Sequence, residues 1–273
     1  MSIQNRWRPT LAFSIPSLSG LAYLAAFNAP ARLIAVNAGA LAVGLMWVMF
    51  GRLPEGQRAR LLLAGGAALA LFVPLLTGPI VGGVARWLPA GPVSLHSGAL
   101  LLPLITVIAA RERAWGPALL ALAGAALALQ PDAAALAGLA AAGVVLATLN
   151  RSRAFTFVTA SSAALALFTF DAGTLEPQVF TEGVLAHVAA ASWLGAATLA
   201  ATLFLAPLIL LPMHDATRPL AALLIALGVM AVIAPFPYPL IGYGAAPILG
   251  FALALGALGN QRQTEAESDT DRV

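Results

Sequence analysis

The 273-residue sequence contains neither cysteine nor lysine, and only 9% of its residues are charged. Without cysteine, disulfide frameworks and cysteine-based metal sites are excluded. Hydrophobic residues make up 60% of the chain and the mean hydropathy is +0.91, more apolar surface than a water-soluble fold can bury. The composition therefore predicts an all-α, polytopic membrane protein.

Charges, prolines and glycine clusters divide the chain into about ten apolar segments, close to or above the roughly 17 residues that span a bilayer core. These segments are Thr10–Phe27, Arg32–Phe50, Ala59–Gly78, Val93–Ala110, Ala114–Leu129, Ala133–Leu149, Ala154–Phe170, Gly183–Leu211, Pro219–Ala234 and Leu240–Leu258. We predict one ten-helix transmembrane domain over residues 1–260. Residues 261–273 are polar, include four acids and lack apolar periodicity, which predicts a disordered acidic cytoplasmic tail.

All fourteen basic residues are arginines, and they lie between the apolar segments rather than in one patch. With ten spans and both termini in the cytoplasm, twelve arginines fall inside and only Arg32 and Arg86 fall outside. This positive-inside bias supports the helix count, because one miscounted helix would scramble it. The net charge of +3 thus reflects topology in a lipid bilayer, and no nucleic-acid partner is expected.

A polar stretch at residues 171–182 interrupts the apolar sequence and holds Asp171, Glu176 and Glu182, three of the eleven acids. Carboxylates at a membrane boundary are costly unless they are solvated, paired or used. Desolvation raises a carboxyl pKa, which would suit Glu182, next to Thr181, for the role of a general base. The alternative is a solvated acid that the dipole of the following helix stabilises.

Three further stretches fall on the same predicted outer face. Arg86 could hold a phosphate or carboxylate through paired hydrogen bonds, or could anchor with Trp87 at the headgroup level. Asp132 follows Gln130 and a proline at a helix start, where an N-cap is the favoured interpretation and catalysis the minority one. The three prolines and two glycines of residues 235–244 indicate irregular backbone, either a groove lining or a rigid helix entry.

These stretches resemble motifs of the FtsW/RodA shape, elongation, division and sporulation (SEDS) family. The similarity lies in GVARWLPAGPVSLHS at residues 83–97 (family G-x-R-R-W…Q-P-S-E), LQPD at 129–132 (Q-P-D), LEPQVFTEGVL at 175–185 (L-P-E-x-H-T-D-F-I-F) and PYPLIGYG at 237–244 (P-L-P-F-I-S-Y-G-G). The matches occur in the family's order and on the matching loops, over nearly the full length of the chain.

The resemblance implies a SEDS-like (GT-C-like) bundle in a bacterial inner membrane and a peptidoglycan glycosyltransferase, a lipid II polymerase, in cell-wall synthesis, shape or division. It implies an undecaprenyl-linked glycan precursor as substrate, a single-pass penicillin-binding protein as partner and a divalent cation such as Mg²⁺ as candidate cofactor, with no metal ligands assigned. Glu182, in place of the family's aspartate, would be catalytic. The implied substrate-binding residues are Arg86, Asp132, Gln130, Thr181 and Tyr243.

The sequence also departs from the family pattern. The proline of Q-P-S-E is His96, and the glutamate and lysine of the fourth helix fall at Gly98 and Leu101. A catalytically degenerate scaffold that binds cell-wall synthesis proteins is therefore an alternative to the polymerase. A lipid or solute transporter is a third hypothesis, but it predicts ionisable groups near mid-membrane, where only His187 comes close.

Overall fold

The computed structural model describes residues 6–258, apart from residues 92 and 173. The predicted tail at residues 261–273 lies outside these described residues. The described part holds twelve α-helices and one antiparallel hairpin. They are α1 (Trp7–Ala26), α2 (Ala31–Phe50), α3 (Gln57–Ala70), α4 (Val73–Thr77), β1 (Trp87–Ala90), β2 (Val93–His96), α5 (Ser97–Arg111), α6 (Gly116–Leu129), α7 (Ala133–Asn150), α8 (Arg153–Phe168), α9 (Val184–Ala191), α10 (Trp193–Leu210), α11 (Thr217–Ile233) and α12 (Ala245–Ala257).

Five helices are long and apolar enough to cross a membrane: α1, α2, the consecutive α3 and α4, α7 and α10. Five further apolar helices, α5, α6, α8, α11 and α12, have 10–17 residues. Together they correspond to the ten predicted segments. The prediction of a polytopic, helical membrane protein is confirmed.

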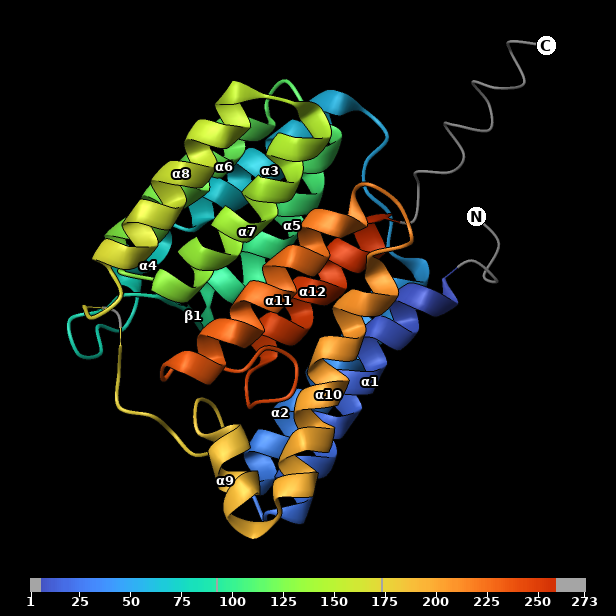
Figure 1. The fold of residues 1–273 in the computed structure, drawn as a ribbon, viewed down its shortest axis with the longest axis vertical. Coiled ribbons are helices and arrows are strands. Elements are labelled where there is room, and N and C mark those ends of the chain that lie inside the picture. Colours follow the sequence, from blue (N-terminus) through green and yellow to red (C-terminus); the bar gives the residue numbers. More distant parts are fainter. Residues whose placement is uncertain (1–5, 92, 173, 259–273) are drawn as a thin grey trace.

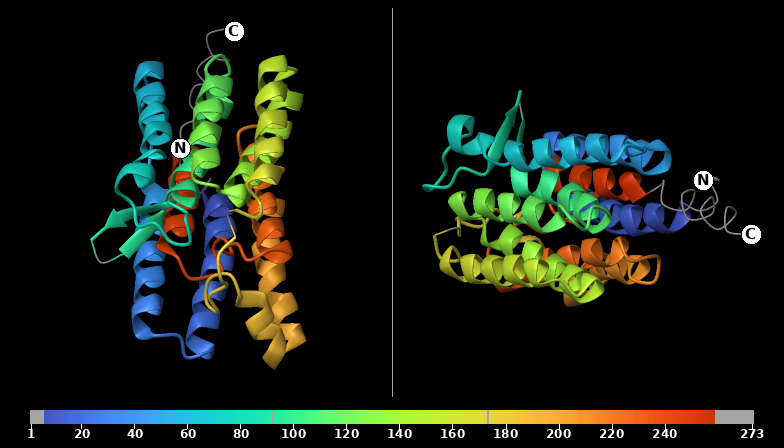
Figure 2. Two further views of the ribbon diagram at one scale, coloured as in Figure 1. Left: turned by 90° about the vertical axis from the view of Figure 1, so that its left-hand side faces the viewer. Right: turned by 90° about the horizontal axis from the view of Figure 1, so that it is seen from above.

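The helices form one bundle in which α12 lies between α2 and α5, α7 packs against α8 and α11, and α1 packs against α10 (Figures 1 and 2). Small residues let these helices approach closely. A Cβ on Gly20 of α1 would meet the backbone oxygen of Ile241 at 2.7 Å, and one on Gly250 of α12 would meet the backbone oxygen of Ala99 on α5. Glycine therefore permits the close approach of α1 to Ile241 and of α12 to α5.

Three predicted segment boundaries were wrong. Val93–His96 is strand β2 and pairs with β1 from Trp87↔His96 to Ala90↔Val93, so the fourth span begins at Ser97. The hairpin turns at Gly91, whose φ of +62° suits glycine. The eighth segment breaks at Ser192, where an extended residue ends α9 and its hydroxyl accepts the Gly195 N–H at 3.1 Å to cap α10. The last segment becomes helical only at Ala245.

The links between helices fall at two opposite ends of the bundle. The α2–α3, α5–α6, α7–α8 and α10–α11 links and the start of α1 lie towards the upper right of Figure 1, and we call this the arginine-rich end. The hairpin, the α1–α2 link and residues 169–183 and 234–244 lie at the lower and left side, the loop end. This agrees with the alternation of the predicted topology, while the orientation of the two ends across the membrane stays a prediction.

Candidate functional site

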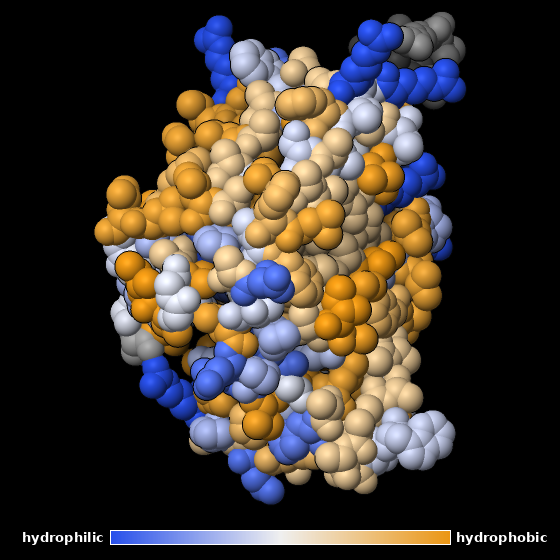
Figure 3. Space-filling model, turned by 60° about the vertical axis from the view of Figure 1, so that its left-hand side comes forward, coloured by the Kyte–Doolittle hydropathy of each residue, from blue (hydrophilic) through white to orange (hydrophobic). Residues whose placement is uncertain are grey.

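A cavity of about 880 Å³ opens at the loop end. Its walls come from the hairpin, the first turns of α2, α5, α7 and α12, and residues 175–182 and 235–247. Apolar side chains such as Leu33, Val36 and Leu102 line it together with a few charged groups. Figure 3 shows this region as a hollowed, polar interruption in a largely apolar surface. The cavity is therefore amphiphilic, as a site for a lipid with a polar head would be.

Two irregular segments form one wall and satisfy each other's backbone groups. The Tyr243 N–H donates to the Phe180 oxygen at 2.6 Å, and the Tyr238 N–H donates to the Thr181 oxygen at 3.1 Å. A Cβ on Gly242 would meet the Thr181 oxygen at 3.0 Å, so glycine permits the close approach. Irregular backbone within a membrane protein is tolerated where protein supplies such partners, and this pairing fixes the segment that carries Glu182.

Asn37, in the second turn of α2, connects the same wall to the bundle. It is buried, its Nδ2 donates to the Gly242 oxygen at 3.0 Å, and its Oδ1 accepts the Gly244 N–H at 3.0 Å. Our sequence reasoning missed this residue. The available signal was an amide side chain inside an otherwise apolar segment.

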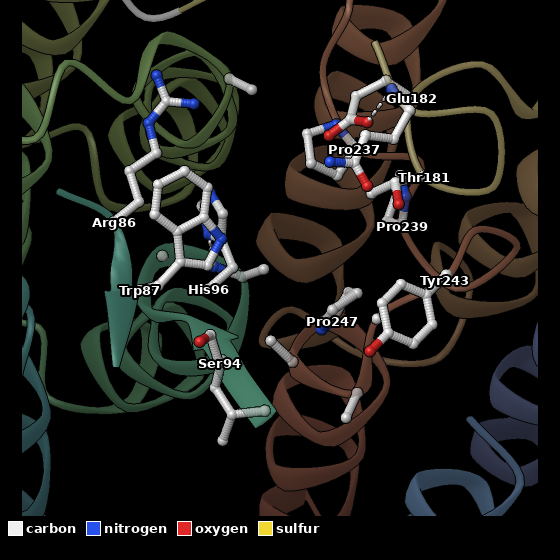
Figure 4. Close-up of a pocket in the computed structure, with 18 of the residues that line it drawn as sticks. Arg86, Trp87, Ser94, His96, Thr181, Glu182, Pro237, Pro239, Tyr243 and Pro247 are labelled. Carbon is white, nitrogen blue, oxygen red and sulfur yellow. Dashed lines mark hydrogen bonds between the residues drawn. The ribbon is translucent and has the colours of Figure 1, made fainter. Parts of the chain in front are cut away.

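Glu182 is half-buried at the rim of this wall. Its Oε2 accepts the Gln178 N–H at 2.9 Å. Burial raises the pKa of the Glu182 carboxyl above its ordinary value, while backbone N–H groups and the charge of Arg86 act in the opposite direction. Thr181 and Tyr243 lie on the same side of the cavity (Figure 4). A carboxyl with a raised pKa is suited to accept a proton near neutral pH.

Arg86 lies on the facing wall, which the hairpin forms (Figure 4). It is 3% exposed, and its guanidinium donates from Nε to the Gln130 oxygen at 3.3 Å and from Nη2 to the Pro131 oxygen. Its own carbonyl accepts the Ser97 N–H at 2.8 Å. These bonds hold the hairpin against the α6–α7 turn and place a fixed positive charge across the cavity from Glu182.

Asp132 and His96 cap the two helices that begin beside Arg86. The Oδ1 atom of Asp132 accepts the Ala135 N–H of α7 at 3.2 Å, and the Nδ1 atom of His96 accepts the Ala99 N–H of α5 at 3.3 Å. The other acidic oxygen, Oδ2, lies 3.6 Å from His96 Nε2. Burial lowers the pKa of His96, against the opposing influence of Asp132. We had not predicted His96 as a site residue, although its place in the family-like motif was visible.

Gly98 explains one departure from the family pattern. A Cβ at this position would meet Asp132 Oδ2 at 2.7 Å and the Ala135 Cβ at 3.1 Å. The buried carboxylate of Asp132 thus occupies the space that a side chain at position 98 would need. It lies at the positive ends of both α5 and α7, which stabilise a negative charge.

The predicted substrate-binding residues divide into two groups. Arg86, Asp132, Thr181 and Tyr243 line the cavity with Glu182. Gln130 is fully buried behind it: its Oε1 accepts the Ser97 hydroxyl at 3.0 Å and its Nε2 donates to the Leu71 oxygen. The geometry gives Gln130 a structural role, and its contact with substrate stays a prediction.

No group of three or more histidine, aspartate or glutamate side chains that could hold a metal ion occurs between residues 6 and 258, leaving aside 92 and 173. Within the described residues, the three acids of the 171–182 stretch do not come together as one ligand group. The described residues thus supply no set of three or more protein ligands for a divalent cation.

The bundle and its cavity define a class: a polytopic membrane protein with an amphiphilic cavity at one end, lined by an arginine on one wall and a glutamate on the other. A scan against protein-family models and a search of curated proteins found no match. Among solved structures, the chain is similar to the rod shape determining protein RodA of Thermus thermophilus, with a TM-score of 0.61, 22% identity, and 92% of this chain and 94% of that chain covered. An aspartate-to-alanine variant of that protein gives the same values.

A second similar structure is a chain from a study of how a peptidoglycan synthase complex coordinates polymerization and crosslinking, with a TM-score of 0.53 and 21% identity over 90% of this chain and 94% of that one. The resemblance to the SEDS family drawn from the motifs is therefore confirmed in fold.

Proposed function

We propose that this protein is a SEDS-type peptidoglycan glycosyltransferase of a bacterial inner membrane, with both termini in the cytoplasm. The observation that carries the proposal is Glu182, a carboxyl with a raised pKa, facing the guanidinium of Arg86 across an amphiphilic cavity. The RodA-like fold supports the same function. The substrate is an undecaprenyl-linked glycan precursor, whose apolar chain suits the apolar lining.

In the proposed reaction, the Glu182 carboxylate takes the proton from a hydroxyl of the acceptor sugar. The oxygen of that hydroxyl attacks the anomeric carbon of the donor, and the bond from this carbon to the diphosphate breaks. The diphosphate leaves with the bonding electrons, so the anomeric configuration inverts. Arg86 stabilises the negative charge that develops on it. Thr181 and Tyr243 bind the substrate from the side of Glu182, and Asp132 from the side of Arg86.

The test is polymerisation of lipid II by the purified protein. We expect glycan strands from the wild type and at least about a 100-fold slower reaction for Glu182→Gln, since general-base catalysis contributes about 10²- to 10⁴-fold. Asp171→Asn is the matched control, because Asp171 is an exposed acid of the same segment that does not line the cavity. The assay is run with and without Mg²⁺ and with a candidate single-pass penicillin-binding protein, the partner we propose. Equal rates for Glu182→Gln and the wild type would exclude Glu182 as the base.

A non-catalytic scaffold is the second candidate, and Arg86 favours it. The guanidinium of Arg86 already donates to two backbone carbonyls, a use that serves the structure of the α6–α7 turn. A wild-type protein that makes no polymer under any of these conditions, yet co-purifies with cell-wall synthesis proteins, would establish this alternative.

A further inference from the structure

A single hydroxyl group, that of Tyr23 on α1, binds the chain on both sides of Glu182. It donates to the Val179 oxygen at 3.2 Å and lies 3.1 Å from Nδ1 of His187 on α9. Val179 precedes Glu182 by three residues, and His187 follows it by five. Tyr23 therefore joins the two ends of the segment 179–187, which we call the Glu182 turn.

The two contacts of this hydroxyl require one arrangement of hydrogen atoms. A tyrosine hydroxyl carries a single hydrogen, and here that hydrogen is donated to the Val179 oxygen. The contact with His187 then needs a hydrogen on Nδ1, which the hydroxyl oxygen accepts. Tyr23 is thus a donor towards one end of the Glu182 turn and an acceptor towards the other, and a phenylalanine could make neither bond.

Aromatic packing holds the His187 ring in position for this bond. The centroid of the ring lies 4.7 Å from that of Phe27 and 5.7 Å from that of Phe180, both in edge contacts. The ring of buried Tyr23 makes a third edge contact at 6.0 Å. Such edge-to-face pairs are a favoured geometry for aromatic rings. The ionisable residue inside the eighth predicted segment therefore has a defined place and a defined hydrogen bond.

The Glu182 turn is itself built on one carbonyl group. The Gln178 oxygen accepts the N–H groups of residues 181–183 at 2.9 or 3.0 Å, while the Gln178 N–H donates to Glu182 Oε2 at 2.9 Å. Neither Tyr23 nor His187 lines the cavity. An effect of these two residues on a reaction in the cavity must therefore act through the position of Glu182.

We propose that Tyr23 and His187 are positioning residues for Glu182, and that their shared hydrogen bond keeps the turn in the orientation that presents the carboxylate to the cavity. This inference rests on the proposed function, in which Glu182 takes a proton from the acceptor sugar. Loss of either residue should lower kcat and leave the KM for lipid II unchanged, because neither touches substrate. A misplacement of about 1 Å can cost about 100-fold, so we expect kcat to fall about 10- to 100-fold.

The first test needs no turnover and compares Tyr23→Phe, which loses only the hydroxyl, with Ser19→Ala. Ser19 is the matched control because it lies one turn earlier on α1 and its hydroxyl bonds to that of Thr202 on α10 at 2.7 Å. Hydrogen–deuterium exchange is followed in the peptide that covers residues 178–187. We expect Tyr23→Phe to speed exchange of the amides of residues 181–183 about fivefold, the effect of one typical hydrogen bond. Ser19→Ala should match the wild type.

The second test measures polymerisation by variants of both residues. His187→Leu should be as slow as Tyr23→Phe, whereas His187→Asn should restore the wild-type kcat, since an asparagine amide can donate from the place of Nδ1. The double variant Tyr23→Phe/His187→Leu should be no slower than either single variant, because all three lose the same bond.

Equal exchange of residues 181–183 in Tyr23→Phe and Ser19→Ala would overturn the inference, whether or not the protein polymerises lipid II. So would a wild-type kcat for Tyr23→Phe, or effects of Tyr23→Phe and His187→Leu that multiply in the double variant. A wild type that makes no polymer, while Tyr23→Phe shows the faster exchange, would refute the proposed function and leave the hold of Tyr23 on the Glu182 turn standing.

Discussion

Replacing Asn37 by alanine should destabilise the protein and weaken its activity through one set of lost bonds. The substitution removes two hydrogen bonds of 3.0 Å and leaves the Gly242 carbonyl and the Gly244 N–H without their partner. A buried polar group without a partner costs about 1–3 kcal/mol, so two such groups, one of them only partly buried, should cost about 2–4 kcal/mol. Asn37→Asp keeps the acceptor for the Gly244 N–H but buries a carboxylate against the Gly242 carbonyl oxygen, so it should cost at least as much.

The assay is thermal unfolding of the purified protein in one detergent, where about 2–4 kcal/mol corresponds to a Tm lower by about 5–15 °C. Asn150→Ala is the control, since the side chain of Asn150 donates only to Leu146 of its own helix. The reasoning is refuted if Asn37→Ala unfolds at the same temperature as Asn150→Ala. Because residues 238–243 bind residues 180 and 181, we also expect lower polymerisation by Asn37→Ala at temperatures where it is still folded.

Three further predictions each concern a single residue: Gly98, Glu182 and Glu112. Gly98→Ala should lower stability by about 1–3 kcal/mol, because its Cβ would lie 2.7 Å from Asp132 Oδ2, whereas Gly65→Ala, with nothing within 4 Å, should be neutral or stabilising in the same denaturation series. The polymerisation rate should fall about tenfold per pH unit as the pH drops below the raised pKa of Glu182, because protonation removes the base. The fall should start at a higher pH than for an ordinary glutamate. A flat pH–rate profile down to pH 4 would contradict this. Glu112→Ala should destabilise by about 3 kcal/mol, since it removes the 4% exposed carboxylate that the Arg60 guanidinium contacts at 2.7 Å and leaves Arg60 only its bonds to the Pro54 and Glu55 carbonyls. A melting curve that matches the wild type would contradict this.

The spans were predictable because hydropathy reports directly on immersion in lipid. The gathering of the outer loops was predictable as well, since alternate links of a helical bundle lie at the same end. The hairpin was missed because strand Val93–His96 has only four residues and runs directly into the apolar sequence of α5, so it was counted as the start of that helix. The break at Ser192 was missed because a serine cap needs no charge, proline or glycine cluster to end a membrane helix.

The site was predictable only in part, because the contacts that were missed join residues far apart in the sequence. Glu182 and Arg86 were identified from motif resemblance and from their place on one predicted face. Asn37 was missed because its partners lie 205 and 207 residues away along the chain, so no local pattern connects them. The hydrogen bond from Gln130 Nε2 to the Leu71 oxygen, 59 residues away, was not predicted for the same reason.

The structure also changes what the loss of charge at position 98 means. Read from sequence alone, glycine in place of an acid on the fourth helix favours a decayed, inactive relative. In the folded chain, the carboxylate of Asp132 lies in the space of the absent side chain, between the positive ends of α5 and α7 and 3.6 Å from His96. A glutamate at position 98 would collide with Asp132 and place a second negative charge against it. Gly98, His96 and Asp132 are therefore mutually consistent, and the glycine by itself is no evidence of lost activity.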